Sequence, residues 1–145
     1  MPQALHNQLG IAVGQETLAS YQSLLASPRW QRAFNAGARP QRLLFASTGT
    51  KDPKASDTLY VEALAAPFTV NTMPEKTLNA FAEHGTIAAS LPLHVKDVFA
   101  RFAAAGIDTD ALAAQLQVEG AASFVKSWTD LMSCIESKGK TIKAA

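Results

Sequence analysis

The chain has 145 residues, of which 48% are hydrophobic, so it is long enough to bury the core of one ordinary domain. Its formal net charge is +1 and its lysines are spread along the sequence, which gives no indication of a nucleic-acid partner or a membrane surface. A single cysteine excludes an intramolecular disulfide framework. With no signal-peptide pattern and no apolar stretch near the ~18 residues of a membrane span, we expect a cytoplasmic protein.

The chain begins with a mixed segment, residues 1–14, in which two glycines interrupt any helical pattern. From Glu16 apolar residues recur at three-to-four spacing, which predicts a first helix that ends before Ser27-Pro28. Ser27-Pro28 then predicts the N-cap and first-turn proline of a short second helix that stops at Gly37. Trp30 is expected to pack inward from this helix.

Two short apolar runs, Leu43–Ala46 and Phe68–Val70, each lead into a polar turn and then a helical pattern. Both runs are too short and too continuous for amphipathic helices, so they predict buried parallel strands. Functional side chains are expected where such strands end. Small, hydroxyl, amide or basic residues lie there: Ser47, Thr48, Gly49, Thr50 and Lys51 after the first run, and Asn71 and Thr72 after the second.

A helix is expected after each of these strands. The first spans Asp57–Ala65, and the second begins with a capping box formed by Thr72 and Glu75 and ends at Gly85. His84 falls in the last turn of the second helix, where a cation suits the helix dipole, so we favour that role over catalysis.

The remainder of the chain is predicted to be helical. One helix is expected between Pro92 and Gly106, and another from Asp108 to Gly120. A last helix is expected to present apolar residues at steps of four, three and four: Phe124, Trp128, Leu131 and Ile135. These three helices are expected to bury one another as a small bundle.

Several phrases of the sequence together resemble the C-terminal part of bacterial transaldolases of the longer, pentose-phosphate type. The phrases are RLLFASTGTKDP, SDTLYVEAL, TVNTMPEKTLNAFAEHG and AAGIDTDALAAQLQVEGAASFVKSW. The resemblance covers roughly Leu5 to Ile135 and is specific, because two strand-end motifs occur in order with matching helices behind them.

The resemblance implies an α/β fold, mostly helical, that forms part of a TIM (β/α) barrel. The expected portion is the last two βα units plus a C-terminal helical extension, since a complete barrel needs roughly 200 residues or more. We expect residues 1–90 to form the barrel units, residues 91–138 the helical extension packed on them, and residues 139–145 a flexible tail.

The resemblance also implies the chemistry. Transaldolases move a dihydroxyacetone unit between sugar phosphates of the pentose phosphate pathway through a lysine Schiff base, with no metal or organic cofactor. In the family this lysine lies on the fourth barrel strand and the assisting carboxylates on the first and third. These strands precede the matched segment, so we expect no catalytic residue in this sequence and no turnover by the chain alone.

The strongest site prediction is sugar-phosphate binding at the ends of the two strands. A recurrent phosphate site of TIM barrels lies in the loops after strands seven and eight, which are the strands that the resemblance assigns here. Ser47 and Thr48 would donate hydroxyl hydrogen bonds and Lys51 a charge, while Asn71 and Thr72 would line the pocket. Ordinary turn chemistry at Ser47 and Thr48, and capping by Thr72, remain open.

A second interpretation is a non-catalytic interaction module. Two strands leave sheet edges and apolar faces uncovered, so the chain is expected to self-associate or to bind a complementary N-terminal half. The three histidines, His6, His84 and His94, are far apart in the sequence, and none has metal-ligand spacing with an acid or with Cys134.

Overall fold

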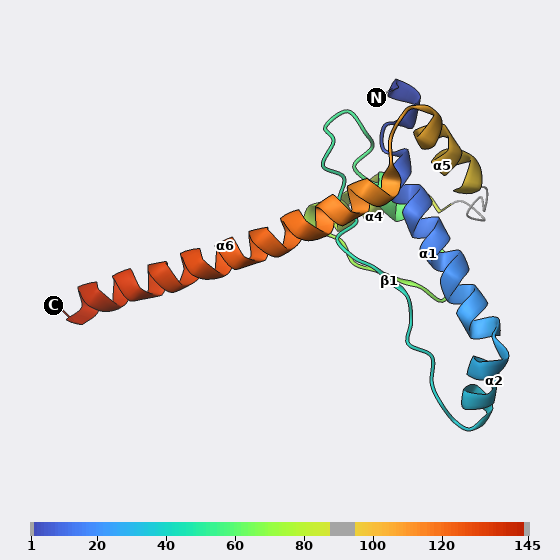
Figure 1. Ribbon diagram of the computed structural model, residues 1–145, viewed down its shortest axis with the longest axis horizontal. Helices are drawn as coiled ribbons and strands as arrows, with labels where there is room; N and C mark the ends of the chain where they lie inside the picture. The colour runs from blue at the N-terminus through green and yellow to red at the C-terminus, as the bar shows by residue number, and fades with distance from the viewer. Residues whose placement is uncertain (1, 88–94, 144–145) are drawn as a thin grey trace. The chain divides into compact units, whose positions relative to one another are not determined.

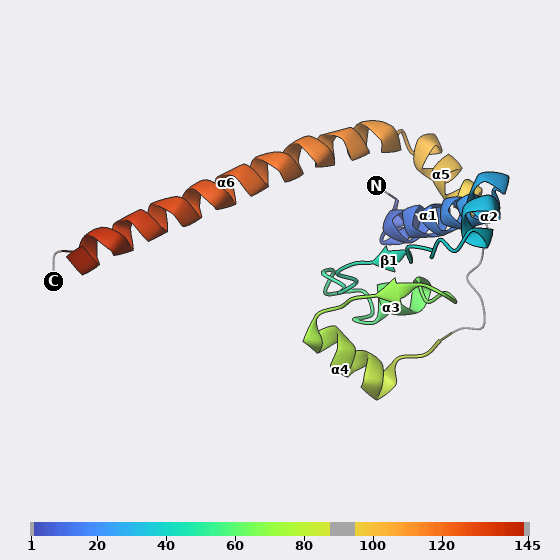
Figure 2. The same cartoon turned by 90° about the horizontal axis from the view of Figure 1, so that it is seen from below.

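A computed structural model describes residues 2–87 and 95–143 of the chain (Figures 1 and 2). The chain divides into two compact units, Met1–Ala105 and Gly106–Ala145, which are described separately. The expected domain boundary between residues 90 and 91, together with Pro92 and His94, lies outside the described residues.

The first unit is mostly helical and contains two short parallel strands. In chain order its elements are η1 (Gln3–Leu5), α1 (Gln8–Ala26), α2 (Pro28–Asn35), β1 (Leu44–Phe45), α3 (Leu59–Ala63), β2 (Val70–Asn71), α4 (Glu75–His84) and α5 (Val95–Ala104). This order confirms a mostly helical α/β chain with two βα units.

Parallel pairing joins β1 to β2, with Leu44 opposite Val70 and Phe45 opposite Asn71. The Val70 amide donates to the Leu43 carbonyl at 2.9 Å, and the Thr72 amide donates to the Phe45 carbonyl at 2.9 Å. The first strand is where the sequence predicted it, but the second begins at Val70 and not at Phe68. Phe68 has a φ of +61° and is 82% exposed, so it belongs to the turn that precedes the strand.

The core of this unit forms where α1 meets β1 and the residue that follows α3. Leu18 of α1, Phe45 of β1 and Leu64 pack together, flanked by Tyr21, Leu43 and Ala66. Figures 1 and 2 both show α1 running beside β1. Apolar contacts of Phe45 therefore hold β1 against α1, the longest helix of the unit.

The start of α1 differs from the prediction, because the helix begins at Gln8 and passes through both glycines. A Cβ at Gly14 would lie 2.6 Å from Leu64 Cδ2, and one at Gly10 would lie 3.5 Å from the Tyr60 ring. Gly14 therefore lets Leu64 pack directly against the helix backbone, and neither glycine ends the helix.

The short helix α2 has the predicted start. The Ser27 hydroxyl accepts from the Trp30 amide at 3.2 Å, with Pro28 in the first turn, and Gly37 follows the helix with a φ of +96°. The predicted inward packing of Trp30 is wrong, because α2 has no buried residue and the half-buried Trp30 ring lies 6.5 Å from that of Phe34.

Two details of the helices after the strands also differ. The helix α3 is shorter than predicted, spanning five residues from Leu59 to Ala63. The predicted capping box of α4 is wrong, because Pro74 occupies the N-cap and no side chain caps the helix. Thr72 lies outside the helix start and its hydroxyl accepts from the Ser47 amide instead.

The helix α5 belongs to the first unit. It packs against α1 and η1, with Phe102 only 2% exposed, and the Arg101 guanidinium donates to the Ala4 carbonyl at 3.3 Å. Gly106, with a φ of +75°, follows the helix as predicted. The predicted bundle of the last three helices is wrong, because the apolar residue Phe102 is buried within the first unit.

The second unit is a single helix, α6 (Thr109–Lys143), of 35 residues. The predicted break at Gly120 is wrong. One glycine in a helix interior costs only about 1 kcal/mol relative to alanine, and strong helix formers surround Gly120. The segment 139–145, expected to be a flexible tail, is helical as far as Lys143. Within the described part of the chain, no helix is both long and apolar enough to span a membrane.

The two glycines of α1 give a matched test of the packing. Gly10→Ala should raise the free energy of unfolding by roughly 0.5–1 kcal/mol, because alanine favours the helix and the site has room. Gly14→Ala should be less stable than Gly10→Ala by at least about 1 kcal/mol, since Leu64 must move from a packed core. Urea denaturation of both variants measures this, and equal stabilisation by both would contradict the contact between Gly14 and Leu64.

Candidate functional site

The carboxyl ends of β1 and β2 meet in a small hydrogen-bond network. Thr48 is 5% exposed, and its hydroxyl donates to Asn71 Oδ1 at 2.6 Å, while its amide donates to the Thr72 carbonyl at 3.1 Å. The single hydroxyl hydrogen of Thr48 is therefore already donated to Asn71. In this arrangement Thr48 fixes the two strand ends relative to each other, and its role as a phosphate ligand stays a prediction.

Ser47 lies beside this network but faces outward. Its side chain is exposed, and its amide donates to Thr72 Oγ1 at 3.4 Å. Its φ of +56° is uncommon for a residue with a Cβ and turns the chain sharply at the end of β1. Ser47 therefore presents an accessible hydroxyl at the strand end.

The loop that follows is held against the start of α4. A Cβ at Gly49 would lie 3.0 Å from Pro74 Cγ and 3.2 Å from Thr77 Oγ1, and Thr77 is buried. This close approach is possible because glycine has no side chain. It brings the first turn of α4 beside the loop.

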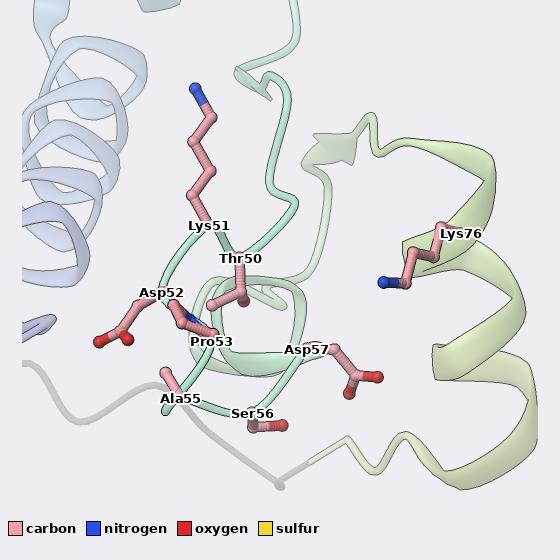
Figure 3. Close-up of a pocket in the computed structure, with 8 residues that line it drawn as sticks. All are labelled: Thr50, Lys51, Asp52, Pro53, Ala55, Ser56, Asp57 and Lys76. Atoms are coloured by element: carbon pink, nitrogen blue, oxygen red, sulfur yellow. The ribbon is translucent and has the colours of Figure 1, made fainter.

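A cavity of about 580 Å³ lies between this loop and α4 (Figure 3). Seven of its lining residues come from the loop and one from the helix: Thr50, Lys51, Asp52, Pro53, Ala55, Ser56, Asp57 and Lys76. In Figure 3 the Lys76 side chain extends from α4 toward the loop, and the Lys51 side chain extends away from the other lining residues. Lys76 therefore directs its ammonium group toward the loop, whereas the ammonium group of Lys51 lies away from the other residues that line the cavity.

The two carboxylates of the cavity are engaged by other groups. Asp52 accepts from the Asn7 side-chain amide at 2.8 Å and from the Lys54 amide at 2.9 Å, and these hydrogen bonds lower the pKa of Asp52. Asp57 pairs with His84. Among residues 2–87 and 95–143, neither Lys51 nor Lys76 is in an ion pair, so both charges are available to an anion.

The Asp57–His84 pair connects the loop to the end of α4. His84 Nε2 lies 2.9 Å from Asp57 Oδ1, and both side chains are about half exposed. This hydrogen bond raises the pKa of His84 and lowers that of Asp57, with the charge of each adding to the shift of the other. His84 thus connects the loop to α4, in addition to its predicted place in the last turn of the helix.

The structure brings four of the five predicted site residues together. Ser47, Thr48, Asn71 and Thr72 meet at the strand ends, and Lys51 lines the adjoining cavity. Sequence reasoning missed Lys76. The available signal was a lysine in the first turn of the helix after the second strand, where TIM barrels place phosphate-binding groups. In the part of the chain that the structure describes, no group of three or more acidic, histidine or cysteine side chains could hold a metal ion.

Residues 2–135 match a model of the transaldolase/fructose-6-phosphate aldolase family. The chain belongs to this family. It is also similar to curated proteins named transaldolase. Identity is 45% over 136 residues with the protein of Frankia alni, 42% over 140 residues with that of Parafrankia sp., and 46% over 135 residues with that of Mycolicibacterium paratuberculosis.

These alignments use 91%, 94% and 89% of this chain but only 37%, 38% and 36% of the relatives. The chain therefore spans little more than a third of the length of the transaldolases it matches. The resemblance predicted from the strand-end motifs is confirmed, and the coverage is consistent with a C-terminal portion of such a protein.

Thr48→Val tests the strand-end network. Valine keeps the shape of threonine but leaves Asn71 Oδ1 without its donor, so the free energy of unfolding should fall by about 1–3 kcal/mol. Thr50→Val is the matched control, because Thr50 Oγ1 is buried and has no hydrogen-bond partner among the described residues. Its replacement should be neutral or stabilising in the same urea titration. Equal losses for both variants would contradict the assignment.

The Asp57–His84 pair predicts a pH dependence. Because the pKa of His84 is raised above 6.5 and that of Asp57 lowered below 3.8, the pair contributes its full stability between about pH 4 and pH 6.5. That contribution is lost as pH rises through the folded pKa of His84 or falls through the folded pKa of Asp57. Asp57→Asn should return the His84 pKa, measured by NMR titration, toward its ordinary value.

Glu83→Gln is the graded control for this titration, because Glu83 acts on His84 through charge alone. It should lower the His84 pKa by less than Asp57→Asn does. A His84 pKa that is the same in the parent protein and in Asp57→Asn would rule out the pair in solution.

Proposed function

We propose that the chain forms the C-terminal part of a transaldolase and carries the end of the active site that binds the substrate phosphate. In this proposal β1 and β2 are the last two strands of a (β/α) barrel. The observation that carries it is the pairing of two parallel strands, the first of which ends at an exposed serine and leads into a loop whose cavity is lined by two lysines. The family membership of the chain supports the same role.

The side chains at this edge fall into two roles. Ser47, Thr48 and Lys51 bind the phosphate: Ser47 offers an exposed hydroxyl donor, Lys51 a cation without an ion pair among the described residues, and Thr48 a hydroxyl that would have to leave Asn71 to donate to the phosphate. Thr48, Asn71 and Thr72 hold the strand ends in register, and in this proposal Asn71 and Thr72 line the pocket of the complete barrel. The phosphate anchors the substrate so that its carbonyl end extends toward the rest of the barrel.

The complete reaction in this proposal transfers a dihydroxyacetone unit between sugar phosphates in the pentose phosphate pathway. A lysine imine serves as the electron sink, so no metal or organic cofactor is needed. In the family that lysine lies on a strand that precedes the matched segment. The 145-residue chain alone should therefore bind sugar phosphate in the cytoplasm without turning it over.

A second candidate is a non-catalytic interaction module that dimerises or binds an N-terminal transaldolase half. Exposed apolar residues of the strands and of the turn before β2 favour it: Leu44 at 48%, Phe68 at 82% and Val70 at 37%. The two strands pair only with each other among the described residues. An apolar surface around such short strands is typical of a protein contact.

Complementation separates the two candidates. The purified chain should show no transaldolase turnover by itself. It should show turnover when co-purified with the N-terminal part of the Frankia alni transaldolase, because the added part supplies the imine-forming lysine. Borohydride reduction in the presence of fructose 6-phosphate should trap the sugar on the added part only. Association without turnover would favour the interaction module. Turnover by the chain alone would refute the proposal that the imine-forming lysine lies outside this chain.

Lys51→Ala tests the phosphate contact in the complemented enzyme. Loss of a hydrogen bond to a charged group costs about 1.5–3 kcal/mol, which corresponds to a rise in KM for fructose 6-phosphate of roughly 10- to 100-fold. Lys54→Ala is the matched control, because Lys54 is exposed on the same loop and does not line the cavity. It should leave KM unchanged. An equal effect of the two variants would argue for general electrostatic attraction.

A further inference from the structure

Lys76 extends from α4 toward the loop that follows β1, across the cavity that both segments line (Figure 3). Its side chain is exposed and, among the described residues, forms no ion pair. Lys51 lines the same cavity, but its ammonium group lies away from the other lining residues, so its flexible stem must turn to reach a ligand there. Lys76 is therefore the cation that the fold already directs at the cavity.

Contacts at both ends of α4 hold the walls of this cavity in place. At the start of the helix, Gly49 of the loop lies against the Pro74 ring. At the end of the helix, Glu62 Oε1 accepts from Thr58 Oγ1 at 2.9 Å and from the Thr86 amide at 3.0 Å, and Thr58 is only 1% exposed. The backbone that carries Lys76 is thus fixed relative to the loop.

The carboxylate of Asp57 is the group of this cavity that acts against an anion at Lys76. Lys76 and His84 lie eight residues apart on α4, about 12 Å along the helix axis, with the buried Ala80 midway between them. The hydrogen bond with His84 is the main cause of the lowered pKa of Asp57, and the charge of Lys76 adds to it. Asp57 therefore interacts with both basic groups of the helix.

The protonation state of His84 decides which charge Asp57 presents to the cavity. A neutral imidazole with its hydrogen on Nε2 still donates to Asp57 Oδ1 across the 2.9 Å contact, but only the protonated ring balances the carboxylate. The hydrogen bond with Asp57 is the main cause of the raised pKa of His84, and the charges of Asp57, of Glu83 on α4 and of Glu62 on α3 add to it. His84 thus stays protonated to a higher pH than a free histidine.

We propose that Lys76 is a further ligand of the substrate phosphate and that His84 controls its availability. A protonated His84 balances Asp57 and leaves Lys76 free for an oxyanion. A neutral His84 leaves Asp57 to attract Lys76 and to repel the oxyanion. Because all three side chains are exposed, the coupling is modest, about two- to fivefold in affinity. This inference rests on the proposed function, since it takes the cavity to be the phosphate end of the active site.

Sulfate binding to the 145-residue chain tests this control. Sulfate keeps both charges throughout the range in which histidine titrates, so any pH dependence belongs to the protein. NMR titration at constant ionic strength should give a dissociation constant about two- to fivefold lower at about pH 6 than at about pH 8.5. Lys76→Ala should raise that constant at least about fivefold at the lower pH. Lys54→Ala, on the same loop but outside the cavity lining, should bind like the parent chain.

Two variants that break the same contact separate control of Lys76 from a structural role. Asp57→Asn removes the opposing charge, so it should bind sulfate at about pH 8.5 as tightly as the parent chain does at about pH 6. His84→Gln leaves that charge unbalanced, so it should bind at about pH 6 as weakly as the parent chain does at about pH 8.5. A shift in the same direction in both variants would overturn the proposal, and so would a parent chain with one affinity at both pH values.

The enzyme complemented with the N-terminal part of the Frankia alni transaldolase separates this inference from the proposed function. Lys76→Ala should raise the KM for fructose 6-phosphate about fivefold or more with little change in kcat, because it removes a contact to the phosphate and not to the reacting carbonyl. A KM that rises in Lys51→Ala but not in Lys76→Ala would refute the inference and leave the transaldolase role standing. Sulfate binding that depends on Lys76 and His84, without turnover in the complemented protein, would refute the role and leave Lys76 as an anion ligand.

Discussion

The parallel pairing of β1 with β2 is the constraint on which the candidate site depends. Two residues on each strand form this sheet, and a few backbone hydrogen bonds hold it, among them those from Val70 to Leu43 and from Thr72 to Phe45. Thr48 extends the pairing one step by side chain and backbone together. Without this register the hydroxyl and amide groups at the strand ends would not meet, because they are more than twenty residues apart in the sequence.

So small a sheet is not stable by itself, and its surroundings supply what the strands lack. Phe45 packs with Leu18 and Leu64, and Gly14 allows that packing by leaving room for Leu64. The loop after β1 is fixed at three points by contacts of different kinds: Asn7 to Asp52, Gly49 against Pro74, and Asp57 to His84. The first and third of these anchors engage the two carboxylates of the cavity, so its lysines carry the charge that is not paired among the described residues.

The sequence predicted those features that are decided by neighbouring residues. The strand Leu43–Ala46, the serine cap of α2 and the glycine stop of α4 follow from local chemistry, and the structure has them at or near the expected positions. The family and its C-terminal coverage were also accessible, because the strand-end motifs are specific. These features need no knowledge of which distant residues touch.

The predictions that were wrong or missing have a common physical cause. Each of these features depends on contacts between distant residues or on competition between weak local signals. Gly14 reads as a helix breaker until Leu64 is known to lie against it, and Gly120 reads as a stop although the surrounding helix propensity outweighs its cost. The sequence around Thr72 has the pattern of a helix cap, but Pro74 occupies the N-cap position of α4. The Thr72 hydroxyl instead accepts a hydrogen bond from the Ser47 amide. Lys76 was missed because its place in the cavity depends on the approach of Gly49 to α4.

Exposed apolar surface in both units connects folding to function. In the first unit Leu44 and Val70 lie opposite each other on the sheet and are both exposed, and α6 in the second unit also carries exposed apolar side chains, among them Phe124 and Trp128. A partner that covers such surface stabilises the folded state by mass action. Under the proposed function that partner would also bring the imine-forming lysine, so the contact that completes the fold would be the one that completes the active site. The strand ends would then be most rigid when the substrate can react, which is the arrangement that catalysis by positioning requires.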